Sequence, residues 1–105
     1  MLGREHWYQV TLLFPLRDND GKPFEEEVWR WWLQEITQLC QGFTDLGVVE
    51  GWWQKHSDQN RWIVMNVKSG QEVDAIRDFL RAARKKFRQK TMYLEYHLVY
   101  FEEIE

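Results

Sequence analysis

The sequence predicts an α+β protein with the ferredoxin-like split β-α-β sandwich, a four-stranded antiparallel sheet with two helices on one face. Two observations support this prediction. Extended and helical segments follow one another in the order β-α-β-β-α-β along 105 residues. Each β-α-β half needs a right-handed crossover, which places both helices on the same face of one sheet. The length suits a single ferredoxin-like domain over residues 1–105, because a second core has no room.

The first half of the chain is expected to form one strand and one helix. Residues 7–14 (WYQVTLLF) are rich in the aromatic and β-branched residues that favour a strand, and Pro15 ends the run. Residues 25–41 carry a helical pattern of apolar positions. Pro23 and the three glutamates after it suit the start of a helix, and Gly42 suits its end.

The second half is expected to form a hairpin, a helix and a last strand. Its predicted elements are a strand at 46–54, a polar loop at 55–60, a strand at 61–68, a helix at 71–88 and a strand at 92–101. The start of the helix is marked by Ser69 and Glu72, which have the spacing of a capping box.

Apolar residues at helical or alternate spacing define the expected core. The arc of the first helix comprises Val28, Trp29, Trp32, Leu33, Ile36, Leu39 and Cys40. That of the second comprises Val73, Ile76, Phe79, Leu80, Ala83 and Phe87. The inward strand residues are expected to be Tyr8, Val10, Leu12, Phe14, Ile63, Met65 and Val67. The last strand is apolar on both sides, so its phase stays open.

Aromatic residues make up 16% of the chain and include seven Trp. Large rings dominate cores and interfaces. Because a small domain has a limited interior, we expect some of them on a surface that another molecule covers. The candidate interaction residues are Trp7, Trp31, Trp52, Trp53 and Trp62. Trp31 falls among polar positions of the first helix, so we expect it either against a strand edge or exposed for a partner.

The expected function is therefore a non-catalytic protein-interaction or self-associating module. Trp7 and Trp62 belong to the outward set of strand residues, on the sheet face that the helices leave open. That face is apolar enough that the simplest cover is a second copy of the chain. The sequence thus predicts a homodimer, and two such sheets that pair face to face would form a dimeric α+β barrel.

An alternative is a ligand-binding cavity or active site between the sheet and its partner. Some dimeric α+β barrel proteins are cofactor-free monooxygenases, and others bind haem or aromatic ligands. Trp62, Asn66 and His97 are the residues for this alternative, since they could polarise or deprotonate an aromatic substrate. It requires His97 to face the open side. RNA stacking on the same face is disfavoured, because residues 61–67 lack the glycines of an RNA-binding strand.

A second alternative is nucleic-acid or phosphate binding through the second helix. Residues 77–90 hold seven basic residues against one acidic residue, while the whole chain has a net charge of −3. The expected basic stripe consists of Arg77, Arg81, Arg84, Lys85 and Arg88. An ordinary solvated helix face explains the same pattern, and the acidic remainder disfavours general nucleic-acid binding.

Other kinds of chemistry lack a signal in the sequence. The three histidines are scattered, and one cysteine allows neither an internal disulfide nor a multi-cysteine metal site. We therefore expect no metal and no cofactor. No apolar run is long enough to span a bilayer, and the first residues do not resemble a signal peptide. A cytoplasmic location and no membrane association are expected.

Several short stretches resemble an uncharacterised family of short bacterial proteins, a domain of unknown function. They are Leu12-Leu13-Phe14-Pro15-Leu16, Asp20-Gly21, Gly42-Phe43-Thr44, Gly51-Trp52-Trp53-Gln54 and Ala83-Arg84-Lys85-Lys86-Phe87-Arg88-Gln89. The family has the β-α-β-β-α-β layout and no established activity. The resemblance therefore implies the fold and transfers no catalytic residue.

Overall fold

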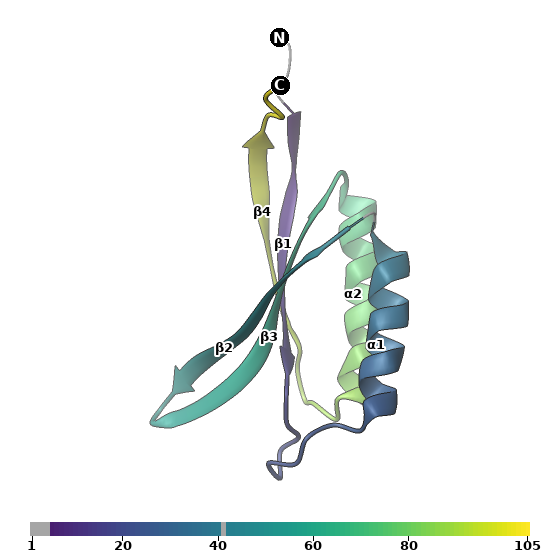
Figure 1. The fold of residues 1–105 in the computed structure, drawn as a ribbon. Coiled ribbons are helices and arrows are strands. Elements are labelled where there is room, and N and C mark those ends of the chain that lie inside the picture. Colours follow the sequence, from purple (N-terminus) through teal and green to yellow (C-terminus); the bar gives the residue numbers. More distant parts are fainter. Residues whose placement is uncertain (1–4, 41) are drawn as a thin grey trace.

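A computed structural model describes residues 5–40 and 42–105. Its elements are β1 (Glu5–Pro15), α1 (Glu26–Leu39), β2 (Thr44–Trp53), β3 (His56–Val67), α2 (Gly70–Lys86) and β4 (Tyr93–Phe101). The strands form one antiparallel sheet in the order β2-β3-β1-β4. Both helices lie side by side on the same face of this sheet (Figure 1). The predicted ferredoxin-like α+β fold is confirmed.

The α2 helix starts and ends for local reasons that the sequence contains. Ser69 caps α2, because its Oγ accepts a hydrogen bond from the Glu72 backbone N–H at 3.4 Å. The Glu72 carboxylate accepts one from the backbone N–H of Lys68, just before the cap. The helix ends at Lys86 rather than at residue 88, since Arg88 takes a left-handed φ of 51°. The α1 helix likewise ends two residues early.

The core lies between the helices and the two central strands. The buried hydrophobic residues are Val10, Leu12, Phe14, Phe24, Val28, Trp32, Ile36, Ile63, Met65, Val67, Val73, Ile76, Phe79, Leu80, Ala83 and Phe87. The predicted arc of α2 is confirmed in full. The prediction for α1 is wrong at Leu33, which is 52% exposed. This helix buries only the narrower stripe of Val28, Trp32 and Ile36.

The predicted hairpin loop is wrong. Residues 56–60 belong to β3, and the turn consists of Gln54 and Lys55 alone. Their φ values of 47° and 73° are both left-handed, as in a type I′ turn. The polarity of residues 56–60 has a different cause. This end of the hairpin extends past the helices (Figure 1), so a buried face is not required there.

The register of β4 settles which way its side chains point. Leu94 lies opposite Leu12, and His97 lies opposite Gln9. Because cross-strand partners share a side, Leu94, like the buried Leu12, points to the helices. His97 therefore points to the open face, as the cavity alternative requires. The open-face residues of β4 are Tyr93, Glu95, His97, Val99 and Phe101.

Candidate functional site

The candidate functional site is the open face of the sheet, on the side opposite the helices. Three cross-strand rows over β3, β1 and β4 form its centre. They are Asn66–Gln9–His97, Val64–Thr11–Glu95 and Trp62–Leu13–Tyr93. In the described part of the chain, both helices lie on the other side (Figure 1). This face is therefore free to meet another molecule.

Aromatic rings occupy both ends of the open face. At one end the Trp7 ring meets the Phe101 ring edge to face, with 5.3 Å between their centroids, and the Lys68 Nζ lies 5.1 Å from the Trp7 ring. At the other end Trp62 is 37% exposed and Tyr93 is 46% exposed. The ends are roughly 20 Å apart, because six residues of β1 separate their rows.

The middle of the open face is more polar than the sequence suggested. Gln9, Asn66 and His97 form one row, and Glu95 lies in the next row along β4. The Tyr93 hydroxyl donates a hydrogen bond to the Glu95 carboxylate, and this bond raises the pKa of Tyr93 above its usual range. The face thus has two aromatic ends and a polar band between them.

The three residues of the cavity alternative share this face but form no single cluster. Asn66 and His97 both flank Gln9, so they lie roughly 10 Å apart, two strand spacings. Trp62 is four residues along β3 from Asn66, roughly 13 Å away. Within one copy this spacing leaves no three-residue contact. A substrate would have to bridge Asn66 and His97 under the cover of a partner.

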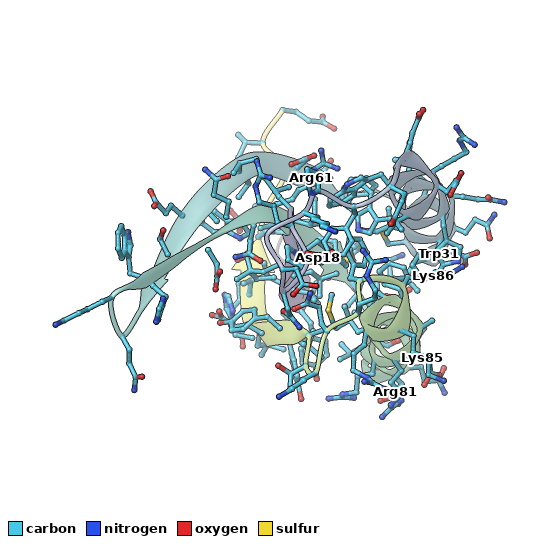
Figure 2. The ribbon with its side chains drawn as sticks, turned by 90° about the horizontal axis from the view of Figure 1, so that it is seen from below. Asp18, Trp31, Arg61, Arg81, Lys85 and Lys86 are labelled. Carbon is cyan, nitrogen blue, oxygen red and sulfur yellow. The ribbon has the colours of Figure 1, made fainter. Side chains whose placement is uncertain are left out.

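Trp31 lies in neither of its two expected positions. Its ring stacks on Phe79 of α2, with 5.7 Å between centroids and 20° between planes. The Lys86 Nζ lies 5.5 Å from the same ring. Figure 2 shows Trp31 and Lys86 close together between the helices. Trp31 therefore joins α1 to α2, which explains an aromatic ring among polar helix positions.

Trp52 and Trp53 lie on the hairpin near its turn. Trp52 pairs with Ser57 across the hairpin and is 68% exposed. The backbone of Trp53 pairs with His56, and its side chain lies outside the described part of the structure. Trp52 is thus an exposed ring on a projecting arm, away from the rows of the open face.

The structure divides the predicted basic stripe into two parts. Arg77, Arg81, Arg84 and Lys85 are on α2, and Figure 2 shows Arg81 and Lys85 on its outer side. Arg88 instead lies beyond the helix end and forms ion pairs with Asp18 and Glu25, at 3.4 and 3.3 Å. The Arg88 guanidinium helps to lower the pKa values of these two carboxyls, after backbone hydrogen bonds, which have the largest effect.

The structure also places two polar groups, the Arg61 guanidinium and the Trp32 indole nitrogen, in surroundings that the sequence does not indicate. The Arg61 guanidinium carbon lies 4.6 Å from the Trp29 ring and 5.1 Å from the Trp32 ring, and its Nε is 3.5 Å from the Asp45 carboxylate. Trp32 is buried, and its Nε1 has no hydrogen-bond partner among the described residues. No sequence signal indicates this stack, because β3 and α1 contribute its members from distant positions.

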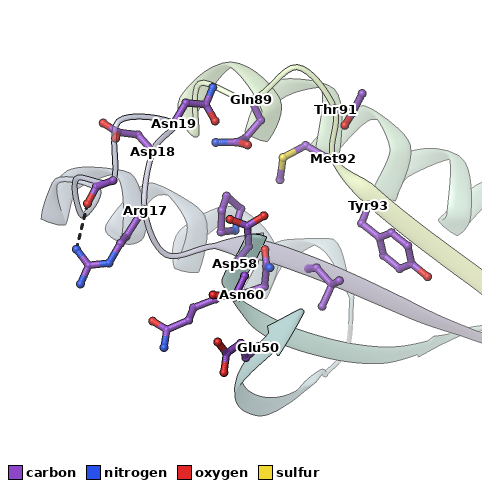
Figure 3. Close-up of a pocket in the computed structure, with 15 residues that line it drawn as sticks. Arg17, Asp18, Asn19, Glu50, Asp58, Asn60, Gln89, Thr91, Met92 and Tyr93 are labelled. Atoms are coloured by element: carbon purple, nitrogen blue, oxygen red, sulfur yellow. Dashed lines mark hydrogen bonds between the residues drawn. The ribbon is translucent and has the colours of Figure 1, made fainter. Parts of the chain in front are cut away.

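A polar cavity of about 670 Å³ was also not predicted (Figure 3). Three distant segments line it: the end of β1 with the loop after it, the hairpin, and the connection from α2 to the start of β4. The Asp18 carboxylate accepts 2.9 Å hydrogen bonds from the backbone N–H groups of Asp20 and Lys22. Arg17 donates to the Gly21 carbonyl at 3.2 Å. Since these charged groups hold their own loop, we assign no ligand to the cavity.

Among the described residues, no three His, Cys, Asp or Glu side chains gather in a way that could hold a metal ion. Burial raises the pKa of the Cys40 thiol, whose Sγ donates to the Gly42 carbonyl at 3.2 Å. This environment disfavours the reactive thiolate. None of the helices described is both long and apolar enough to cross a membrane.

Comparisons with known proteins give no match among family models, curated proteins or solved structures. None of these comparisons supports the resemblance to the uncharacterised bacterial family, and the structure shows only the β-α-β-β-α-β layout that the resemblance implied.

Proposed function

We propose that this protein is a non-catalytic, self-associating module in which the open sheet face is covered by the same face of a second copy. The aromatic ends of that face carry the proposal. Trp62 and Tyr93 are both more than one-third exposed, and Trp7 with Phe101 forms a second aromatic cluster. Exposed aromatic surface of this kind marks interaction sites in small proteins.

The polar band favours a second copy as the partner. An interface with two-fold symmetry brings the same patch together from both copies, so the patch must be complementary to itself. Glu95 supplies an acceptor, His97 can donate, and Gln9 and Asn66 can do both. When two such bands meet, each band offers donors to the acceptors of the other. The aromatic ends would then exclude water around a hydrogen-bonded centre.

Charge substitution at one end of the face tests this proposal. Trp62→Glu places a carboxylate where the partner's apolar surface would bury it, so we expect the dimer to dissociate at least tenfold more readily. Trp52→Glu is the matched control, because this ring lies on the projecting hairpin. Light scattering should give two chains for the control and one for Trp62→Glu. Equal masses for both variants would contradict the proposal.

A ligand cavity in the dimer is the second candidate function. Asn66 and His97 flank Gln9 in one row of the open face, which supports this alternative. Titration with haem, followed by its visible absorption, is a direct test. A cavity around His97 predicts a spectral shift that His97→Ala abolishes while the mass stays that of a dimer. The alternative fails for haem if the protein causes no shift, or if His97→Ala binds equally well.

A further inference from the structure

The two edges of the sheet differ in a way that leaves one of them open to pairing. β2 has a register shift between Asp45 and Val48, and Gly47 within it takes a φ of +88°. Such irregularities protect an edge strand from pairing with another chain. β4 is paired with β1 without a shift along all nine of its residues. Its outer edge therefore presents a regular series of backbone donors and acceptors.

An arginine-lined groove runs beside this regular edge, between α2 and β4. It has a volume of about 220 Å³ and is lined by Arg77, Leu80, Arg81, Arg84, Met92 and Leu94. The apolar residues form a surface that a side chain can cover, and the three arginines come from successive turns of α2. Groove and edge together offer backbone pairing, apolar contact and positive charge in one place.

The three arginines of the groove differ in the hydrogen bonds and ion pairs that they form within the chain. The Arg77 Nη2 donates to the Tyr96 hydroxyl at 2.8 Å, which fixes it over β4. Arg81 forms an ion pair with Asp78 at 2.6 Å. Arg84 donates to the Gln89 carbonyl at 3.3 Å and has no carboxylate partner among the described residues. The Arg84 end of the groove is thus the end with uncompensated charge.

We propose that the β4 edge and this groove bind an extended acidic segment of another protein, which adds to the sheet as a fifth strand. Backbone hydrogen bonds to β4 would hold the segment, and alternate side chains would face α2. Arg77 and Arg84 are separated by about 10 Å along the helix axis. Alternate strand residues are about 7 Å apart. Two acidic residues with one residue between them therefore fit among the three arginines.

Charge complementarity favours this partner over a second copy of β4. The residues of β4 on the helix side are Leu94, Tyr96, Leu98 and Tyr100, none of which is acidic. Pairing of two β4 strands would therefore bring no strand carboxylate to the arginines. Nucleic acid fits less well, because it has no polypeptide backbone that could pair with the regular edge of β4.

Binding of short synthetic peptides tests the proposal. The probe is a fluorescein-labelled octapeptide of alternating Glu and Val, and its control has the same residues in two blocks. We expect the alternating peptide to bind at least tenfold more tightly by fluorescence anisotropy. Arg84→Glu should weaken its binding at least tenfold, whereas Arg30→Glu, the same change on exposed α1, should have little effect. Circular dichroism would establish that both variants fold.

Three results would overturn the proposal. Equal binding of both peptides would show that the arginines attract negative charge and that the peptide does not pair as a strand. Tighter binding of a single-stranded oligonucleotide, lost in Arg84→Glu, would assign the groove to nucleic acid. No peptide binding, together with a lower mass for Arg84→Glu, would assign the groove to a second copy. Because Trp62→Glu affects only the open face, it should leave peptide binding unchanged, which separates this proposal from self-association.

Discussion

Arg61 joins the hairpin to the first helix through its planar guanidinium. It lies against two indole rings of α1 and beside the Asp45 carboxylate of β2. Lysine keeps the charge but not the flat surface that stacks on the rings. We expect Arg61→Lys to lower the free energy of unfolding by about 1 kcal/mol, as for other partly exposed cation–π contacts.

Urea unfolding followed by tryptophan fluorescence checks the Arg61 prediction. Arg30→Lys is the control, since Arg30 pairs with Glu26 at 3.4 Å on an exposed helix face. Surface ion pairs of this kind contribute little to stability, so the control should have almost the same free energy of unfolding as the unmodified protein. Equal losses in the two variants would mean that the stack with Trp29 and Trp32 adds nothing specific.

Asp18 should make stability depend on pH in the acid range. Its pKa is lowered from the ordinary value of 3.8, chiefly because the Lys22 backbone N–H donates to the carboxylate. A lowered pKa in the folded state stabilises the fold above the unfolded value, and this contribution is lost as pH falls through the folded value. We therefore expect Asp18→Asn to show a shallower loss of thermal stability below about pH 4.

The neighbouring carboxyl provides the control for this pH dependence. Asp20→Asn changes the same loop, but the hydrogen bond that the Asp20 residue makes with Asp18 comes from its backbone. The melting temperature of Asp20→Asn should fall with pH as that of the unmodified protein does. If the melting temperatures of Asp18→Asn and the unmodified protein fall in parallel with pH, the Asp18 carboxylate does not cause the acid-range loss of stability.

At the scale of single residues, the spacing of apolar residues along a helix or a strand predicts which of them are buried. The complete apolar arc of α2 is buried, as are the predicted inward residues of β3. Trp31 and Leu33 behave differently, because their surroundings depend on how the two helices meet. Trp31 finds Phe79 on the other helix, while Leu33 lies outside the buried stripe. Such contacts are tertiary and have no signal in the local sequence.

At the scale of elements, the hairpin turn is a point of local strain. Gln54 and Lys55 both have positive φ, a conformation that asparagine and glycine adopt more readily. The double substitution Gln54→Asn and Lys55→Gly should stabilise the hairpin end by about 1 kcal/mol. Since this end extends beyond the helices, the gain should affect local opening more than global unfolding.

Amide hydrogen exchange measures local opening directly. The amides of β2 and β3 next to the turn should exchange about fivefold more slowly in the double variant, which corresponds to about 1 kcal/mol. Amides in the centre of β1 should not change. Gln59→Asn, a similar change within β3, is the control. Unchanged exchange next to the turn would mean that its positive φ values carry no strain.

The existence and order of the elements were predictable, but the hairpin turn was not. Helices show a period that buries one stripe, and central strands show alternation or long apolar runs. Residues 56–60 have neither signal, because their part of β3 meets solvent on both faces. Polarity there indicates exposure rather than a loop. The turn itself lacks the usual Asn-Gly pair, so its sequence gives no warning of its position.

At the scale of the whole molecule, chain order predicted the fold because few compact arrangements satisfy right-handed crossovers. The open face was also predictable, since a two-layer sandwich leaves one side of the sheet uncovered. The phase of β4 was not, because both of its sides carry apolar residues. Only its pairing with β1 places His97 beside Gln9. The division of the open face into aromatic ends and a polar middle was likewise not predictable, because it depends on the register between the strands.

Sedimentation velocity of the unmodified protein measures whether a second copy covers the open face. The run is read at 280 nm, where seven Trp give a strong signal, over a hundredfold range of concentration. If a second copy covers this face, the run should show a species of two 13.0 kDa chains that dissociates on dilution and that Trp62→Glu removes. A single 13.0 kDa chain at every concentration would contradict self-association.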